Sequence, residues 1–274
     1  MFKRKLSLCF FVLGMLLLLG FCLMAFFPSI FTSFSPKTMF EIWEKPNAVH
    51  IFGTDDMGYD VFAETVYGAK STITVGIFGA LLSLLVGTTI GLLASSKGML
   101  GKAFSLLEDL FTILPRFLFL YILASYLEKG SLTLILLIGF FTWGYTGRAV
   151  KEESLRIQES SFYQNGVVMG LSKEKNIIRH LLPHLFPVLL ARFLVLVSSS
   201  IMMESTLSFL GLGDQYNVSW GTLINLVYRN GAFLSKQYGA LLLPGLAIAT
   251  LSLSFFFISL PFSSKRRPHL FKRK

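Results

Sequence analysis

The chain has 274 residues, of which 53% are hydrophobic and only 15% are charged. Soluble domains carry about a quarter charged residues, so a chain this apolar is not expected to hide its nonpolar side chains in one water-surrounded core and should lie in a bilayer. The net charge of +10 fits nucleic acid, an anionic membrane surface or basic cytoplasmic loops, and the positions of the charges decide between these classes.

Apolar runs predict six transmembrane helices, because crossing a bilayer takes roughly 20 mostly apolar residues. The runs cover residues 6–27, 71–94, 103–127, 132–145, 184–207 and 238–262. The first run follows a basic start, as a signal peptide does, but its length and the poor cleavage site after Pro28 favour an uncleaved anchor. Cys9 and Cys22 both lie in this run, which argues against a disulfide framework or a zinc finger.

Six spans place both termini on one side of the membrane, and the basic residues indicate which side. With the termini inside, 17 lysines and arginines fall in inner segments and six in outer segments. This bias predicts cytoplasmic termini and explains the basic balance without nucleic acid. The predicted organisation is an anchor helix at 1–27, a periplasmic connector at 28–68, a pore domain at 69–262 and a basic cytoplasmic tail at 263–274.

Small residues recur along one face of the second predicted span. They are Gly76, Ala80, Ser83, Gly87 and Gly91. Small side chains let helix backbones approach closely inside a membrane. Two interpretations stay open: ordinary packing inside a helix bundle, which we favour, and a role in lining or gating a pore.

The charged segment 148–183 is too polar to span and too long for a tight connection. Its apolar residues Phe162, Tyr163, Val167, Val168 and Leu171 suggest a short helix, which Ser160 or Ser161 caps and Gly170 ends. On the cytoplasmic side, such a helix fits either a groove on a soluble partner or the surface of the inner leaflet.

Ionisable residues inside predicted spans are candidates for function. Glu108 and Asp109 lie near the inner end of the third span and are expected to form a solvated pair at the interface. Arg116 lies deeper, beside Pro115, which should kink the helix. It should face the bundle or the pore, with Glu204 as a candidate partner.

No catalytic or metal-binding pattern is visible in the sequence. His180 and His184 are four residues apart, but Pro183 lies between them and no third ligand is evident, so no metal site is predicted. The patterns H-E-x-x-H, G-x-S-x-G and G-x-x-x-x-G-K-[ST] are all missing. The chain is therefore not expected to be an enzyme, and ATP-driven transport would need a separate polypeptide to bind the nucleotide.

The cytoplasmic segment resembles a known motif. Gly170 is followed by Pro183 in the run Arg179-His180-Leu181-Leu182-Pro183, which is similar to the Glu-Ala-Ala, three residues, Gly and downstream Leu-Pro of ABC importer permeases. In that family the loop docks into the ATPase subunit and transmits its closure to the pore. Gln164, Asn165 and Gly166 stand where the family has Glu-Ala-Ala, and Gly166 costs about 1 kcal/mol of helix stability against alanine.

Two further stretches narrow the resemblance. The first stretch, residues 50–61, contains His50, then Gly53-Thr54-Asp55, and ends in Asp60-Val61. It looks like the His-Pro-Leu-Gly-Thr-Asp-x-x-Gly-Arg-Asp-Val segment of dipeptide and oligopeptide permeases. Tyr59 stands in place of the arginine. Residues 204–213 and Ser219-Trp220-Gly221 are similar to the family's Glu-x-x-Leu-Ser-Phe-Leu-Gly-Leu-Gly and Ser-Trp-Gly. Asp109 followed by Pro115 also fits the third span of the family.

The resemblance is to C-type permeases of the oligopeptide, dipeptide and nickel importer group. It implies an all-α membrane protein with the type I ABC importer fold and an ABC type-1 pore domain at 69–262, located in the cell inner membrane. It also implies a second homologous permease, two ATPase subunits that hydrolyse the ATP, and a periplasmic binding protein that delivers the solute.

The resemblance also implies functional residues. The ATPase-coupling loop comprises Phe162, Tyr163, Gln164, Asn165, Gly166, Val167, Gly170, Leu171 and Pro183. The periplasmic or gate motif comprises Glu204, Ser208, Phe209, Gly211, Gly213 and Trp220. Asp109, Pro115 and Arg116 are pore or bundle candidates. We favour peptides as the cargo, with nickel as the alternative within the family and an ion-coupled secondary transporter or channel as the alternative outside it.

Overall fold

The computed structural model describes residues 2–264, which form an all-helical bundle without a β-strand. The all-α prediction is therefore confirmed. The elements are α1 (Phe2–Phe26), η1 (Pro28–Ile30), α2 (Val61–Ala94), α3 (Met99–Ile113), α4 (Arg116–Tyr126), α5 (Ser131–Thr142), α6 (Gly144–Gln158), α7 (Ser161–Val168), α8 (Lys173–Asn176), η2 (Ile177–Leu181), α9 (Leu182–Leu207), η3 (Ser208–Leu212), α10 (Trp220–Arg229) and α11 (Tyr238–Ser264).

The described residues contain four helical segments long and apolar enough to cross a membrane. They are Leu6–Phe26, Val61–Ala94, Glu174–Leu212 and Tyr238–Phe262. The pair α5 and α6, bent by 43°, makes a fifth if it is counted as one span. The predicted count of six is not confirmed, because the third predicted run forms two separate helices, α3 and α4.

Both interrupted helices have identifiable causes. Pro115 separates α3 from α4, and Leu114 before it has the extended backbone that a following proline favours, with ψ of 135°. The second interruption lies at Trp143, between α5 and α6. The two interruptions pack together: the Phe111 and Trp143 rings are 4.9 Å apart, and a Cβ on Gly144 would lie 3.3 Å from Thr112 Oγ1.

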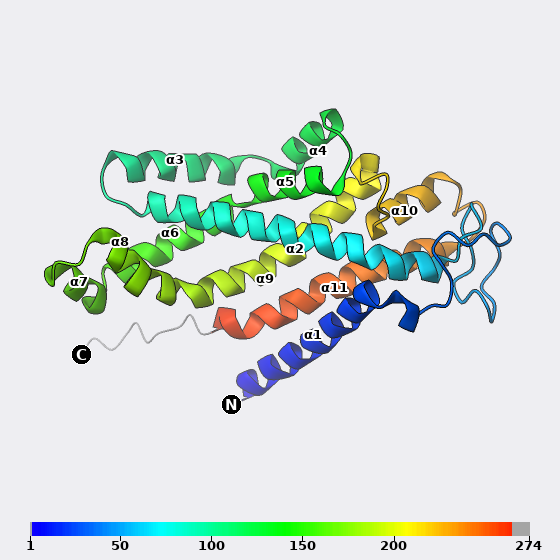
Figure 1. Cartoon of the computed structure of the whole chain (residues 1–274), viewed down its shortest axis with the longest axis horizontal. Coiled ribbons are helices and arrows are strands. Elements are labelled where there is room, and N and C mark those ends of the chain that lie inside the picture. Colours follow the sequence, from blue (N-terminus) through cyan, green and yellow to red (C-terminus); the bar gives the residue numbers. More distant parts are fainter. Residues whose placement is uncertain (1, 265–274) are drawn as a thin grey trace.

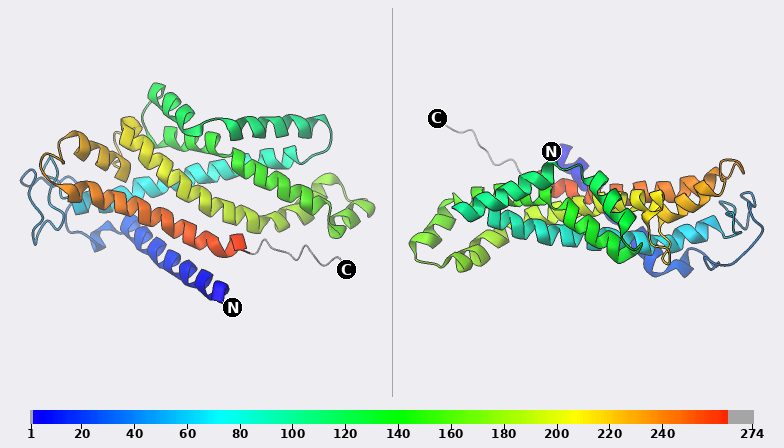
Figure 2. Two further views of the ribbon diagram at one scale, coloured as in Figure 1. Left: turned by 180° about the vertical axis from the view of Figure 1, so that it is seen from behind. Right: turned by 90° about the horizontal axis from the view of Figure 1, so that it is seen from above.

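The helices lie roughly along the long axis of an elongated molecule (Figures 1 and 2), and α2 contacts α1, α5, α6, α9 and α10. This helix starts at Val61, ten residues before the predicted span, because the Asp60 side chain caps it by accepting from the Ala63 amide at 2.7 Å. At 1.5 Å per residue, its 34 residues extend over about 51 Å, which exceeds the roughly 30 Å of bilayer hydrocarbon. One end of α2 therefore projects beyond the apolar layer.

The small-residue stripe of α2 packs inside the bundle, as favoured from the sequence. A Cβ on Gly76 would lie 2.4 Å from the Ile201 side chain of α9, and one on Gly91 would lie 2.5 Å from the Gly147 carbonyl of α6. Ser83 accepts a hydrogen bond from Thr142 of α5. The stripe therefore forms the contact surface of α2 with three neighbouring helices.

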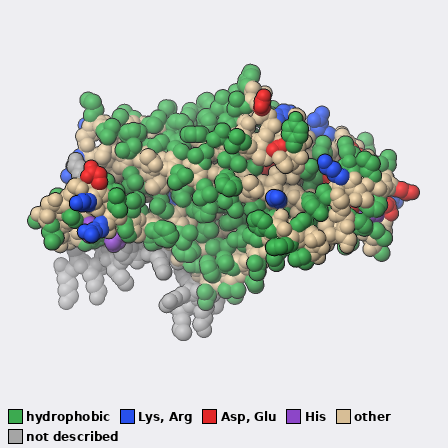
Figure 3. All heavy atoms as spheres, in the orientation of Figure 1, with side chains coloured by type: hydrophobic (Ala, Val, Ile, Leu, Met, Phe, Trp, Pro, Cys, Tyr) green, Lys and Arg blue, Asp and Glu red, His purple; other side chains and the backbone are tan. Residues whose placement is uncertain are grey.

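The two ends of the molecule differ in their loops. Helices α7 and α8 form one end, here called the α7 end, whereas the segment 28–60 and the loops around α10 form the other, here called the connector end (Figure 1). On the face shown in Figure 3, apolar side chains cover most of the middle and charged side chains gather toward the ends. This distribution suits a protein that spans a membrane along its long axis.

Candidate coupling helix and transport path

Helix α7 is the short helix predicted in the segment 148–183. It ends in a Schellman motif, in which the Gly170 amide donates to the Val167 carbonyl and the Leu171 amide donates to the Gly166 carbonyl. Gly170 has φ of +75°, a conformation that glycine adopts without strain. Its predicted role as the stop signal is confirmed. Ser160 occupies the N-cap position, but its hydroxyl donates to the Ile157 carbonyl and does not cap α7.

The predicted apolar face of α7 divides between two environments. Tyr163 packs against a buried cluster formed by Val150, Ile157, Leu181 and Leu185. Val168 and Met169, in contrast, are 85% and 82% exposed at the tip of the α7 end. Gln164, Asn165 and Val167 are also exposed, and Leu171 is half-buried. The helix is thus anchored on one side and presents an uncovered apolar tip on the other.

Gly166 explains how the loop tolerates its departure from the family pattern. It is buried, and a Cβ at this position would lie 2.6 Å from Asn176 Oδ1 of α8. Asn176 is itself 1% exposed and donates to the Tyr163 carbonyl at 3.3 Å. Glycine at 166 therefore allows α8 to lie directly against α7.

The segment after α8 connects this loop to a long membrane helix. Pro183 lies in the first turn of α9, where a proline requires no backbone donor. The Phe162 ring stacks on His184 in the same turn, with centroids 4.5 Å apart. The stacking on His184 thus holds Phe162 at the start of α9, in the turn that contains Pro183, although Pro183 is 21 residues later in the sequence.

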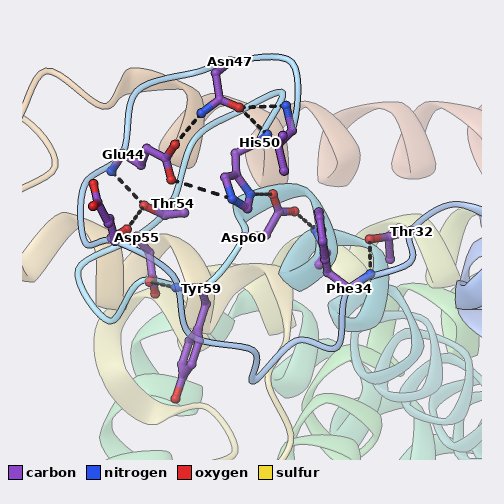
Figure 4. A network of polar contacts seen from close by, with 12 residues as sticks. Thr32, Phe34, Glu44, Asn47, His50, Thr54, Asp55, Tyr59 and Asp60 are labelled. Atoms are coloured by element: carbon purple, nitrogen blue, oxygen red, sulfur yellow. Dashed lines mark hydrogen bonds and ion pairs between the residues drawn. The ribbon is translucent and has the colours of Figure 1, made fainter.

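At the connector end, the His50–Val61 segment forms a network that holds the start of α2 (Figure 4). The His50 Nδ1 atom lies 2.8 Å from Asp60 Oδ2, and its Nε2 atom lies 3.7 Å from Glu44 Oε2. Gly53 and Gly58 both have φ of +78°, and each would clash with a carbonyl if it carried a Cβ. This motif therefore caps and orients α2, since Asp60 serves both His50 and the first turn of the helix.

The residues of the predicted gate motif lie together around Glu204. This carboxylate is 1% exposed and accepts from the Ser208 hydroxyl at 2.7 Å and the Ser205 hydroxyl at 3.2 Å. The chain then kinks at Gly211, whose φ is +81°. The Phe209 carbonyl accepts from Asn225 of α10 at 2.6 Å, which fixes the kinked segment to that helix.

Trp220 anchors α10 against α2. Its side chain is fully buried, its backbone amide donates to Thr72 Oγ1 and its indole N–H donates to the Thr65 carbonyl at 2.7 Å. Gly213 is needed for close packing, because a Cβ there would lie 2.6 Å from Ser208 Oγ. The whole motif, read as a gate from the sequence, is therefore one tightly packed junction of α9, α10 and α2.

A cavity of about 500 Å³ opens beside this junction at the connector end. Tyr59, Glu64, Tyr67 and Lys70 line it, together with Asn217 of the loop before α10. Glu64 was missed from the sequence because it was assigned to a polar connector. The cap at Asp60 is a signal for its place in the first turn of α2, but its burial, at only 9% exposed, follows from the segments packed around it.

Near the α7 end, an ion-pair cluster joins α3 to α6. Glu108 lies 3.2 Å from Arg148 and 3.7 Å from Lys151, and Asp109 lies 2.5 Å from Arg148. The expected solvated pair is wrong for Glu108, which is fully buried because α6 covers it. Asp109 is half exposed and serves the same contact between helices.

Arg116 and Glu204 are not brought together as partners. The Arg116 guanidinium lies over the Tyr145 ring, with its Cζ 4.5 Å from the ring centroid, at the interruption between α5 and α6. Glu204 instead bonds to the hydroxyls of its own helix and of η3. At Pro115, where the sequence predicted a kink, the helix breaks completely, and this places Arg116 in the first turn of α4.

Comparison with known proteins agrees with this geometry. Residues 79–267 match the family described as binding-protein-dependent transport system inner membrane component. A putative peptide permease protein of Brucella suis biovar 1 is 32% identical over 77% of this chain and 70% of its own length. The dipeptide transport system permease protein DppC of Alkalihalophilus pseudofirmus is 27% identical over 92% and 82% of the two chains.

The oligopeptide transport system permease protein OppC of Bacillus subtilis is 27% identical over 77% of this chain and 71% of its own length. The family match covers more than half of the chain and spans the helices from α2 onward, including the α7 loop and the Glu204 junction. The chain therefore belongs to the binding-protein-dependent transport system inner membrane components, the multi-pass permease subunits of ABC importers.

Proposed function

We propose that this chain forms half of the translocation path of an ATP-driven importer of oligopeptides or dipeptides, with both termini in the cytoplasm. The reported relatives are named for peptides, dipeptides and oligopeptides, which supports a peptide cargo over nickel. The bias of basic residues supports this orientation, in which the α7 end lies inside. An ion-coupled transporter loses its one candidate pair, because Arg116 and Glu204 have separate partners.

The proposed complex contains a second homologous permease, two ATPase subunits and a periplasmic binding protein. ATP is bound and hydrolysed by the ATPase subunits, since this chain has no phosphate-binding loop. The binding protein delivers peptide at the connector end, where the segment 28–60 and the loops around α10 gather (Figure 1). This assignment follows from the family, in which the binding protein and the ATPase act on opposite sides of the membrane.

The observation that carries the coupling proposal is the uncovered apolar tip of α7. Val168 and Met169 are more than four-fifths exposed on a helix that Gly166 and the Schellman motif hold in place. A rigid helix with one apolar tip fits a groove on a partner. Its junction with α9 through Phe162 and His184 gives a direct route from the ATPase to a membrane helix.

Affinity purification in mild detergent tests this proposal. We expect the tagged wild-type chain to recover an ABC ATPase, identified by mass spectrometry, and Val168→Asp to lose most of it because a charge enters the apolar contact. Leu234→Asp is the matched control, since Leu234 is 90% exposed but lies at the connector end. Equal recovery with Val168→Asp would favour α7 lying on the inner leaflet, and no ATPase with wild type would contradict the importer itself.

A further inference from the structure

A second cavity, of about 250 Å³, lies beside the interruptions of the two broken helices, between α4, the α5–α6 bend and α9. Two arginines line it, Arg116 and Arg192. We infer that this cavity holds the terminal carboxylate of a peptide in transit. The inference rests on the proposed function and adds to it a chemical group on the cargo that the permease itself recognises.

The lining of the cavity is polar on two sides. From α9, Arg192 and Ser199 are seven residues apart and lie on the same face of that helix. From the α5–α6 bend, Thr142, Tyr145 and Thr146 line the opposite side. The cavity therefore combines two guanidinium groups with the hydroxyl groups of Tyr145, Thr146 and Ser199, which are chemically able to donate hydrogen bonds to an anion. The Thr142 hydroxyl already donates within the bundle, to the Ile138 carbonyl and Ser83.

Arg116 is held in a position that leaves its charge available. Its guanidinium lies over the Tyr145 ring at 4.5 Å, and a face-on contact leaves the N–H groups at the edge of the guanidinium plane. None of the ion pairs found in the described part of the chain involves Arg116. An ionised side chain at membrane depth is costly without a counter-charge, so an anionic group entering this cavity would be stabilised.

The break at Pro115 adds to the same preference. Arg116 lies in the first turn of α4, which begins directly after Pro115. A helix N-terminus carries partial positive charge. The α5–α6 bend adds no such charge, because Trp143 keeps a helical backbone and the C-terminal end of α5 lies beside the start of α6. The interruption at Pro115 therefore places one helix N-terminus and one arginine beside the cavity.

A carboxylate is the anion that best matches this arrangement. Arginine binds carboxylates through two parallel hydrogen bonds, which gives geometric selectivity as well as attraction. Every peptide with a free C-terminus carries this group whatever its sequence, so the site would hold varied peptides by a shared feature. A lipid phosphate offers similar chemistry, and uptake into vesicles with and without anionic lipid distinguishes the two ligands.

Uptake by the reconstituted complex tests the inference. The permease pair, its ATPase subunits and its binding protein are placed in proteoliposomes, and uptake of a tripeptide is compared with that of its C-terminal amide. We expect Arg116→Gln to lower uptake of the free acid about tenfold relative to wild type, a typical effect of losing a charged hydrogen bond, while uptake of the amide stays the same. Arg192→Gln should lower the acid-to-amide ratio in the same direction.

Two further variants sharpen the test. Arg116→Lys keeps the charge but loses the planar pair of donors, so its acid-to-amide ratio should lie between wild type and Arg116→Gln. Arg229→Gln is the control, since Arg229 is an exposed arginine at the end of α10 and should leave the ratio unchanged. ATPase activity stimulated by the binding protein shows whether each variant is assembled, and Arg192→Gln provides the readout if Arg116→Gln is not.

The possible outcomes separate the inference from the function on which it rests. A wild-type complex that imports neither peptide contradicts the proposed function. Import by wild type with an equal loss of acid and amide uptake in both arginine variants overturns the carboxylate site alone. An effect of Arg116→Gln that disappears in vesicles without anionic lipid assigns the site to a lipid phosphate and also overturns the inference.

Discussion

At the scale of single residues, the missing side chain of Gly166 decides how closely α8 packs against α7. The family pattern has alanine at this position, which favours the helix by about 1 kcal/mol. In this chain the space of that methyl group is taken by Asn176, whose Oδ1 would lie 2.6 Å from the added Cβ. Glycine at 166 therefore leaves room for Asn176, and the loop between α7 and α8 remains closely packed.

We predict that Gly166→Ala loosens the packing of α7 against α8. The added methyl forces α8 away from α7, and overpacking of this kind costs about 1–3 kcal/mol, more than the gain in helix propensity. Hydrogen exchange in the segment 161–176 should become faster. Recovery of the ATPase should fall with it.

The matched test adds Asn176→Ala to the Gly166→Ala background. Removing the amide clears the clash, so the double variant should regain most of the protection that Gly166→Ala loses, although the bond to the Tyr163 carbonyl is gone. Such non-additivity is expected for residues in direct contact. If Gly166→Ala exchanges like wild type, the contact with Asn176 does not constrain the loop.

At the scale of elements, the small-residue face of α2 sets how closely α6 approaches. The tightest contact with α6 is at Gly91, where a Cβ would lie 2.5 Å from the Gly147 carbonyl and 2.9 Å from Val150 Cβ. A backbone atom has little freedom to move away, so the helices themselves would have to separate. Close helix contacts inside membranes depend on small residues for this reason.

We predict that Gly91→Ala lowers the thermal stability of the purified protein by about 1–3 kcal/mol of unfolding free energy, the usual effect of overpacking. Gly245→Ala is the control, because this glycine of α11 has no atom within 4 Å of its added Cβ. Its unfolding temperature should stay level or rise. A Gly91→Ala protein that unfolds at the wild-type temperature would mean that α2 and α6 separate without a penalty.

At the scale of the whole molecule, Asp214 ties segments 83 residues apart. Its carboxylate accepts from the Ser131 amide at 2.9 Å and the Ser131 hydroxyl at 2.6 Å, at the start of α5, and from the amides of Tyr216 and Asn217. Burial raises the pKa of this carboxyl, but the bonds from Ser131 and Asn217 outweigh burial and hold the pKa below its ordinary value. The charged form is therefore the one that stabilises the fold.

We predict that Asp214→Ala destabilises the protein by about 1–3 kcal/mol, because the Ser131 amide and hydroxyl and the two loop amides lose a charged acceptor. A carboxyl with a lowered pKa contributes fully above its unfolded pKa near 4 and loses that contribution as the pH falls toward the folded pKa. The gap in unfolding temperature between wild type and variant should thus be equal at pH 6 and pH 8 and narrow only below about pH 4. A gap that changes between pH 6 and pH 8 would show that another group is responsible.

The candidate sites were predictable to different degrees. Gly170 was assigned correctly to the end of α7, because glycine adopts a positive φ without strain. Pro183 was assigned to the end of the polar segment, whereas the structure places it in the first turn of α9. The burial of Glu108 and the location of Glu64 in a cavity were not predictable. Both depend on which distant helix or loop covers the carboxylate, and no local pattern carries that information.

Composition and local pattern alone indicated that this protein is helical, lies in a membrane, bends its third apolar run at Pro115 and ends α7 at Gly170. These features depend on apolar length, on the missing amide of proline and on the conformational freedom of glycine. Only the tertiary structure decided that Arg116 lies over Tyr145, that Glu204 bonds to serines and that two interrupted helices meet beside one cavity. The physical reason is that these contacts join helices far apart in sequence, so they follow from how the bundle packs.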